Sequence, residues 1–111
     1  MPYHVERINK IIERELSSIL LTEAKHPLLK YVSVTKVSCT KDLSIATIWY
    51  SVIGKSDEIE ATSKALEESR GYLRSEIAKR IDLRKAPDLK FKYDSSLEYG
   101  RHIEELLKES K

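Results

Sequence analysis

The spacing of apolar residues changes between a helical and a strand period along this chain, and the order of the changes restricts its fold. From Val5 to about Leu21, apolar residues recur every three or four positions, which predicts an amphipathic helix. The helix must end near His26-Pro27, because proline cannot continue the hydrogen-bond ladder and disfavours helical geometry in the residue before it. Two segments rich in β-branched and aromatic residues follow, 31–39 and 43–53, with turn-forming residues at 40–42. They predict a β-hairpin.

Within the first predicted strand, the apolar residues change phase. Val32 and Val34 fall on one face, whereas Val37 and Cys39 fall on the other if the alternation is strict. That change of phase predicts a β-bulge between the two pairs. The second strand should end at Gly54.

Residues 57–81 return to helical spacing, but Gly71 lies inside the pattern. An interior glycine costs about 1 kcal/mol relative to alanine, so its presence argues for a kink, a break or a close approach. We therefore predict two helical halves that meet at Ser69-Arg70-Gly71. Gly71→Val is expected to destabilise such a kink and to disturb the basic surface around it.

Two further segments complete the pattern. Residues 89–93 alternate apolar and basic side chains, which predicts a half-exposed edge strand with Lys90 and Lys92 turned away from the core. Ser95 and Glu98 have the spacing of a capping box ahead of a helical apolar pattern, which predicts a C-terminal helix.

The resulting order is helix, strand, strand, kinked helix, strand and C-terminal helix, which predicts an α+β fold with helices on one face of a three-stranded sheet. One domain should span residues 1–111, because two would each be too small to bury a core. The order resembles a type II KH-like domain, and KH domains clamp nucleic acid with a GXXG loop. Ser69-Arg70-Gly71 stands in place of that loop, and fold order by itself does not establish function.

Positive charge is concentrated late in the chain. Residues 69–93 carry eight basic and three acidic side chains, a net charge of +5, whereas the remainder carries twelve basic and fifteen acidic ones, a net charge of −3. A polarised surface of this kind is typical of proteins that meet phosphate. On charge alone, an ordinary solvated face is an equally good interpretation.

Several classes of protein are disfavoured by the motifs that the sequence lacks. Cys39 is the only cysteine, which favours a reducing, cytoplasmic location. The three histidines are far apart, and there is no HExxH pair, Gly-x-Ser-x-Gly elbow or Gly-rich phosphate loop. We expect no enzyme activity, no metal and no cofactor. No apolar run is long enough for a membrane span, and the N-terminus does not resemble a signal peptide.

A series of short motifs extends over nearly the whole chain. They are Glu15-Leu16-Ser17, the strand pair around Val37 and Asp42-Leu43 to Ala46, Gly71-Tyr72-Leu73-Arg74, Leu83-Arg84 through Pro87-x-Leu89-x-Phe91, Asp94-Ser95-Ser96 and Gly100 to Leu107. In this order and spacing, the motifs resemble the bacterial ribosome-binding factor A family. The family carries an Ala-x-Gly kink where this chain has Ser69, and an arginine near the start of the first helix where this chain has His4.

This resemblance implies RNA binding without catalysis. The protein would bind the free, immature 30S subunit, contact 16S ribosomal RNA, and assist late maturation of the subunit and processing of 16S pre-rRNA. It implies a cytoplasmic monomer that acts without a cofactor and without a membrane partner.

The candidate RNA contacts lie in the basic segment: Arg70, Arg74, Lys79, Arg80, Arg84 and Lys85. Arg70 and Arg74 are four residues apart and therefore near neighbours at the kink, and the planar guanidinium of arginine suits phosphate. Reversing both charges is expected to weaken subunit binding and to leave the protein folded.

Two alternatives stay open. Arg7, Lys10 and Arg14 form a second basic stripe on the first helix, although neighbouring glutamates favour solvated intrahelical pairing there. The basic segment could also bind an acidic protein partner, which would make the chain a protein-interaction module. Excess ribosomal RNA should displace an RNA-binding factor from subunits and leave a protein-interaction module bound.

Overall fold

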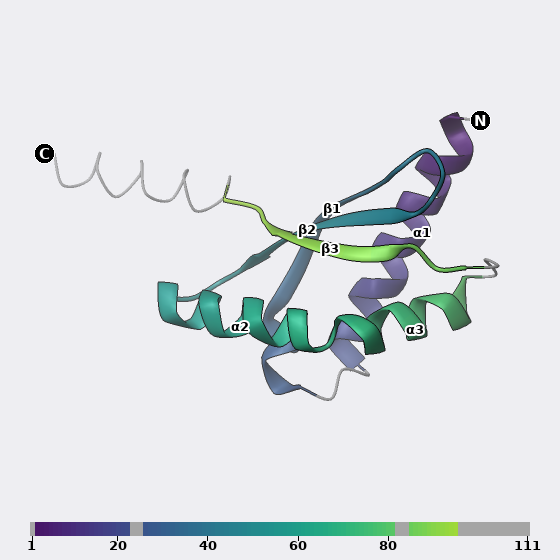
Figure 1. The fold of residues 1–111 in the computed structure, drawn as a ribbon. Helices are drawn as coiled ribbons and strands as arrows, with labels where there is room; N and C mark the ends of the chain where they lie inside the picture. The colour runs from purple at the N-terminus through teal and green to yellow at the C-terminus, as the bar shows by residue number, and fades with distance from the viewer. Residues whose placement is uncertain (1, 23–25, 82–84, 96–111) are drawn as a thin grey trace, which may run out of the picture.

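The computed structural model describes residues 2–22, 26–81 and 85–95 of the chain (Figure 1). In chain order, the elements are α1 (Pro2–Thr22), the 3-10 helix η1 (Pro27–Tyr31), β1 (Val32–Cys39), β2 (Ile45–Val52), α2 (Ser56–Glu68), α3 (Arg70–Arg80) and β3 (Asp88–Tyr93). The predicted order of helix, hairpin, kinked helix and strand is confirmed. The C-terminal helix that was predicted after Ser95 lies outside the described residues, as does Arg84.

The three strands form one mixed sheet in the order β1-β2-β3. β1 and β2 are the antiparallel hairpin, and their register shifts between Val34 and Lys36, which confirms the predicted bulge. β2 and β3 run parallel. Parallel neighbours need a long crossover connection, and α2 and α3 form it. β3 is therefore an edge strand of the sheet.

The hairpin turn is organised around one carboxylate. Asp42 Oδ1 accepts hydrogen bonds from the Thr40 and Ser44 hydroxyls at 2.7 and 2.8 Å, and from the Ser44 backbone N–H at 3.1 Å. These bonds favour the ionised carboxylate and lower the pKa of Asp42 to about 2. Next to it, Leu43 has a φ of 59°, in the left-handed region that bulky residues rarely adopt. The hydrogen bonds on either side hold this conformation in place.

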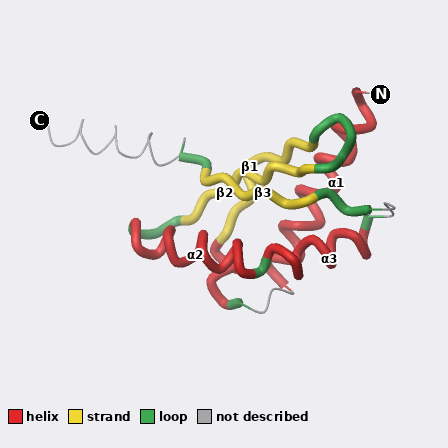
Figure 2. Tube along the Cα trace, viewed as in Figure 1, coloured by secondary structure: helices red, strands yellow, loops and turns green. Residues whose placement is uncertain are grey.

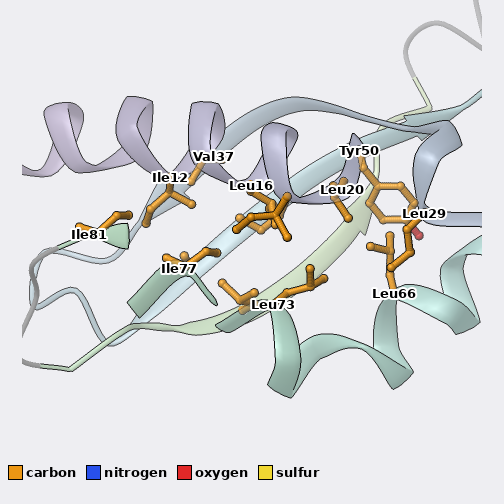
Figure 3. Packing of buried hydrophobic residues seen from close by; sticks show 14 of the residues in the cluster. Ile12, Leu16, Leu20, Leu29, Val37, Tyr50, Leu66, Leu73, Ile77 and Ile81 are labelled. Carbon is orange, nitrogen blue, oxygen red and sulfur yellow. The ribbon is translucent and has the colours of Figure 1, made fainter. Parts of the chain in front are cut away.

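The helices cover one face of the sheet (Figure 2). Every second residue of β2 is buried against them: Ala46, Ile48, Tyr50 and Val52. In Figure 3, Ile12 and Leu16 of α1 and Ile77 of α3 point into the same space, and all three are fully buried. The opposite face of the sheet carries polar and charged side chains together with the exposed Ile45 and the partly exposed Trp49.

α1 supplies the largest helical share of this core. Its buried residues are Ile8, Ile12, Leu16, Ile19 and Leu20, and they follow the predicted helical period. On its flank, Asn9 Oδ1 accepts a hydrogen bond from the Cys39 backbone N–H at 2.8 Å, which ties α1 to the end of β1. Within the described part of the chain, no helix is long and apolar enough to cross a membrane.

The 3-10 helix η1 was not predicted from the sequence. It begins at Pro27, whose fixed φ suits a first helical position, and His26 Nδ1 accepts a hydrogen bond from the Leu28 N–H at 3.3 Å. Leu29 is buried against the core. A helix of five residues is too short for its apolar residues to repeat with a helical period. From the sequence, His26-Pro27 therefore indicated only the end of the preceding helix.

Candidate nucleic-acid interface

α2 and α3 meet at a break centred on Ser69, which ends one helix and precedes the next. The Ser69 N–H donates to the carbonyl oxygens of Ala65 and Leu66 at 3.0 and 3.2 Å. Its own carbonyl oxygen accepts from the Leu73 N–H at 2.9 Å. The backbone of Ser69, at φ −93° and ψ 0°, lies in the bridge region between helix and turn. The predicted kink is therefore one residue that belongs fully to neither helix.

Gly71 lies inside α3 and makes no close approach. A Cβ built on it would meet no heavy atom within 4 Å, and its φ is not positive. The break between the helices is at Ser69, two residues before Gly71, the glycine from which it was predicted. No other segment packs closely against Gly71. What Gly71 provides is open space on the surface beside Arg70.

Two separate hollows lie between the helix pair and the edge of the sheet at β3. The hollow at the start of α3 has a volume of about 350 Å³ and is lined by Arg70, Gly71, Arg74, Asp88 and Leu89. The hollow along α2 has a volume of about 620 Å³ and is lined by Tyr50, Ser56, Ile59, Glu60, Ser63, Lys64, Glu67 and Tyr93. We call the two hollows together the edge groove. Its arginines lie at the α3 end, whereas the α2 end carries two glutamates and one lysine.

Arg74 is held within the edge groove by contacts to the protein itself. Its Nε and Nη2 donate to the carbonyl oxygen of Ala86 at 3.2 and 3.0 Å, and Nη1 lies 3.1 Å from Asp88 Oδ1. A guanidinium has five N–H donors in a rigid fork, and much of this fork is occupied. Arg74 therefore fastens α3 to the start of β3, and a phosphate would compete with these contacts.

Arg70 and Lys79 are more available. Their side chains are 55% and 70% exposed. Arg70 lies 3.5 Å from Glu67, across the break at the end of α2, and Lys79 lies 3.3 Å from Glu76, within α3. Exposed pairs of this kind contribute at most about 1 kcal/mol, so a phosphate can replace the glutamate at little cost. Lys85, before β3, is also exposed.

Arg80 reaches across the core side of the domain to α1. Its Nη1 lies 3.1 Å from Glu15 Oε2, and the two side chains are 25% and 23% exposed. The partners are 65 residues apart in sequence, so no local spacing could have revealed the pair. Arg80 and Arg74 thus connect elements of the fold, whereas Arg70, Lys79 and Lys85 are exposed.

The stripe on α1 is exposed as well. Arg14 lies 3.5 Å from Glu15, which is one instance of the pairing expected there. Among the residues that the structure describes, Arg7 and Lys10 form no ion pair. They provide a second basic surface, on α1, which shares no residue with the edge groove.

The element order, the parallel edge strand and the helix pair broken beside that strand define a KH-like α+β domain of the second type. The model of the family described as Ribosome-binding factor A matches residues 4–107 of the chain. The chain belongs to the ribosome-binding factor A family.

Relatives of that name are similar over almost their whole length. The protein of Macrococcus caseolyticus is 42% identical over 109 residues, which cover 98% of this chain and 96% of the relative. That of Desulforamulus reducens is 41% identical over 109 residues, covering 98% and 91%. The crystal structure of ribosome-binding factor A from Thermus thermophilus has a TM-score of 0.69 at 20% identity, covering 80% of this chain and 93% of that one.

A second similar structure is a Thermus thermophilus homology model fitted into a cryo-EM map of a 30S–RbfA complex. It has a TM-score of 0.64 at 22% identity, and covers 77% of this chain and 89% of that one. At such identities the two Thermus structures establish the likeness of the fold alone.

Proposed function

We propose that this chain is a ribosome assembly factor that binds the immature 30S subunit through 16S ribosomal RNA. Membership of the ribosome-binding factor A family carries the proposal, because the similarity extends over nearly the whole chain. The homology model of a Thermus thermophilus relative was fitted into a map of a 30S–RbfA complex. The chain would assist late maturation of the subunit and processing of its 16S pre-rRNA, as a monomer in the cytoplasm.

The α3 end of the edge groove supports an RNA contact. KH domains clamp the nucleic-acid backbone at the turn between two helices, and the corresponding turn here is followed by the exposed Arg70. Since no side chain fills the space beside Gly71, a phosphate can approach the helix there and accept hydrogen bonds from the Arg70 guanidinium. Lys85, exposed next to Ala86, which Arg74 contacts, would add attraction close by. Lys79 lies nine residues after Arg70 in α3, on about the opposite side of the helix, and would contribute only longer-range attraction.

The proposed function is binding without catalysis. Cys39 is the only thiol of the chain, and burial raises its pKa, so at neutral pH it stays protonated and is a poor nucleophile. A protein that binds one conformation of the subunit RNA more tightly than another shifts the equilibrium toward the first. That shift is sufficient for an assembly factor.

Cosedimentation with purified 30S subunits tests the proposal. The protein should sediment with free subunits, and excess 16S ribosomal RNA should displace it. Retention on subunits despite excess RNA, with displacement by an acidic protein, would instead identify a protein-interaction module.

A pair of charge-reversal variants locates the contact. Arg70→Glu with Lys85→Glu should weaken subunit binding at least tenfold, because close cation–phosphate contacts become repulsive. Arg7→Glu with Lys10→Glu makes the same change in net charge on α1 and is the matched control. Equal losses in the two variants would mean that net charge, and not the edge groove, decides binding.

A further inference from the structure

The face of the sheet that the helices leave uncovered carries its own cluster of side chains. Val37, Ile48 and Leu89 are buried against the helices, one on each strand. Because neighbouring residues of a strand point to opposite faces, the residues next to them in each strand lie on the other face. That face, which we call the open face, is centred on Lys36, Thr47, Trp49, Lys90 and Lys92. The three lysines are exposed, and Thr47 and Trp49 are partly exposed.

Lys36, Trp49 and Lys92 form one row across the three strands. Lys36 is paired with Trp49 in the register of β1 and β2, and Trp49 with Lys92 in the register of β2 and β3. Trp49 thus has a lysine as its neighbour on each adjacent strand. Lys36 Nζ lies 5.1 Å from the centroid of the Trp49 ring, a cation–π contact. Along the same face, the next paired residues are Thr47 and Lys90.

The bulge in β1 creates this row. Val34 is paired with Tyr50, and regular alternation beyond that point would place Lys36 opposite Ile48, inside the core. Burial of an unpaired ammonium is very unfavourable. The register shift after Val34 instead places Lys36 opposite Trp49, so the bulge keeps the core apolar and adds a cation to the open face.

The charge of the open face is predominantly positive. Three lysines lie on it: Lys36, Lys90 and Lys92. Among the residues that the structure describes, none of the three forms an ion pair with a carboxylate. The carboxylates at its two ends are already engaged, Asp88 with Arg74 at 3.1 Å and Asp94 as the acceptor of a hydrogen bond from the Thr35 hydroxyl at 2.8 Å. An anionic ligand would therefore meet ammonium groups that it does not have to share.

We propose that the open face binds an unpaired nucleotide of RNA, with the base stacked on the indole of Trp49 and the phosphates next to Lys36 and Lys92. Aromatic rings among cations are the means by which proteins bind single-stranded nucleic acid. An acidic protein would use the lysines but would give the indole no role. Lys36 has a long, flexible side chain. Its ammonium group can leave the Trp49 ring and bind a phosphate instead, which exposes the face of the ring to the base.

This inference rests on the proposed function for the source of the RNA, and it adds a second contact surface. β3 joins the two surfaces, because Leu89 lines the edge groove while Lys90 and Lys92 lie on the open face. A single RNA strand can therefore pass from the groove around the edge of the sheet. The α2 end of the groove, with Glu60 and Glu67, is a less favourable path for a phosphate backbone.

Trp49 is the only tryptophan of the chain, so its fluorescence reports directly on the open face. Addition of a short single-stranded oligoadenylate to the full-length protein should quench this emission, because the base stacks on the ring. An RNA duplex of equal length and polyglutamate provide negative charge without an unstacked base, and they should quench far less. Equal quenching by polyglutamate would overturn the proposal and identify a docking surface for acidic protein.

Substitutions on the open face test the proposed contacts. Trp49→Leu should weaken binding of a labelled oligoadenylate by about 5- to 150-fold. Lys36→Gln with Lys92→Gln should reduce the slope of log affinity against log salt by roughly 1.4, since each single-strand phosphate contact contributes roughly 0.7. Lys41→Gln with Lys55→Gln removes the same charge elsewhere and should leave the slope unchanged. The lysine variants keep the test valid if the partly buried Trp49 is needed for folding, which circular dichroism would reveal.

Two comparisons separate this proposal from the proposed function. If the protein sediments with 30S subunits but no RNA quenches Trp49, and the lysine pair can be replaced without effect, the open-face proposal is wrong and the proposed function stands. If oligoadenylate quenches Trp49 but the protein does not bind subunits, the open face is an RNA site and the proposed function is wrong.

Discussion

Arg74 of α3 and Ala86, just before β3, are joined by two hydrogen bonds from one guanidinium to one carbonyl oxygen, at 3.2 and 3.0 Å. The same guanidinium lies 3.1 Å from the carboxylate of Asp88. These contacts connect the end of the crossover to the edge strand that it positions. Arg70 has the same charge and lies one helical turn earlier, but it does not contact the edge strand. It lies 3.5 Å from Glu67, near the end of α2.

The two arginines should therefore differ in their effect on stability. Arg74→Ala should lower the free energy of unfolding by about 1–2 kcal/mol, because hydrogen bonds to charged groups contribute at this level and the side chain is partly exposed. Arg70→Ala should change it by less than about 0.5 kcal/mol. Urea denaturation of the two variants measures both values. Equal effects would mean that the Ala86 contacts add nothing to stability.

This difference changes the design of the charge-reversal experiment. From spacing alone, Arg70 and Arg74 were equivalent, and reversing both was expected to leave the protein folded. Arg74→Glu would place a carboxylate next to Asp88 and remove both donors to Ala86, so a loss of RNA binding in the double variant could come from unfolding. Arg70→Glu with Lys85→Glu avoids this ambiguity.

The hairpin turn should make stability depend on acid pH. The pKa of Asp42 is lowered to about 2 in the folded protein from an ordinary value of 3.8, so the folded state favours the ionised form. The resulting stabilisation is complete above about pH 4 and is lost as the pH falls through about 2. Thermal melts of the wild type and Asp42→Asn between these limits should converge toward the acid end. A constant difference in melting temperature would show that Asp42 does not titrate in this way.

Periodicity predicted the α-helices and strands of the described fold, but neither the 3-10 helix η1 nor the long-range contacts of the charged side chains. The phase change between Val34 and Val37 located the bulge, because each strand residue must point to one face or the other. Gly71 predicted a break in the helix, and the actual break is two residues earlier, at Ser69. The low helix propensity of glycine favours a break nearby but does not determine the residue at which the helix ends. The pairing of Arg80 with Glu15 depends on how α3 packs against α1, and no local pattern records that.

The Arg80–Glu15 pair is itself open to measurement. A double-mutant cycle with Arg80→Met and Glu15→Gln should give a coupling energy of about 0.5–1 kcal/mol, more than for a fully exposed pair, because water screens the two side chains less. Arg14→Met with Glu15→Gln, for the more exposed Arg14 contact, should give a smaller coupling. A zero coupling for Arg80 would contradict a role in joining α1 to α3.

RNA affinity should depend strongly on salt. If about four to six phosphates are neutralised, the slope of log affinity against log salt should be roughly −3 to −5 for the complex with subunits, because each contact releases bound counterions. Cosedimentation over a range of potassium chloride concentrations gives the slope. A flat titration would contradict phosphate contacts at both the edge groove and the open face.

Substitution of Gly71 by alanine should affect stability and binding in opposite directions. Alanine is favoured over glycine in a helix by up to about 1 kcal/mol, and by less in the first turn. The added Cβ meets no heavy atom within 4 Å, so Gly71→Ala should stabilise the protein slightly. Gly71→Val was expected from the sequence to destabilise the fold; because the space beside Gly71 is open, its loss of stability should be small. Both side chains enter the hollow beside Arg70, so subunit binding should fall, and more for valine. Unchanged binding in both variants, with urea denaturation showing intact folds, would place the phosphate contact of Arg70 outside this hollow.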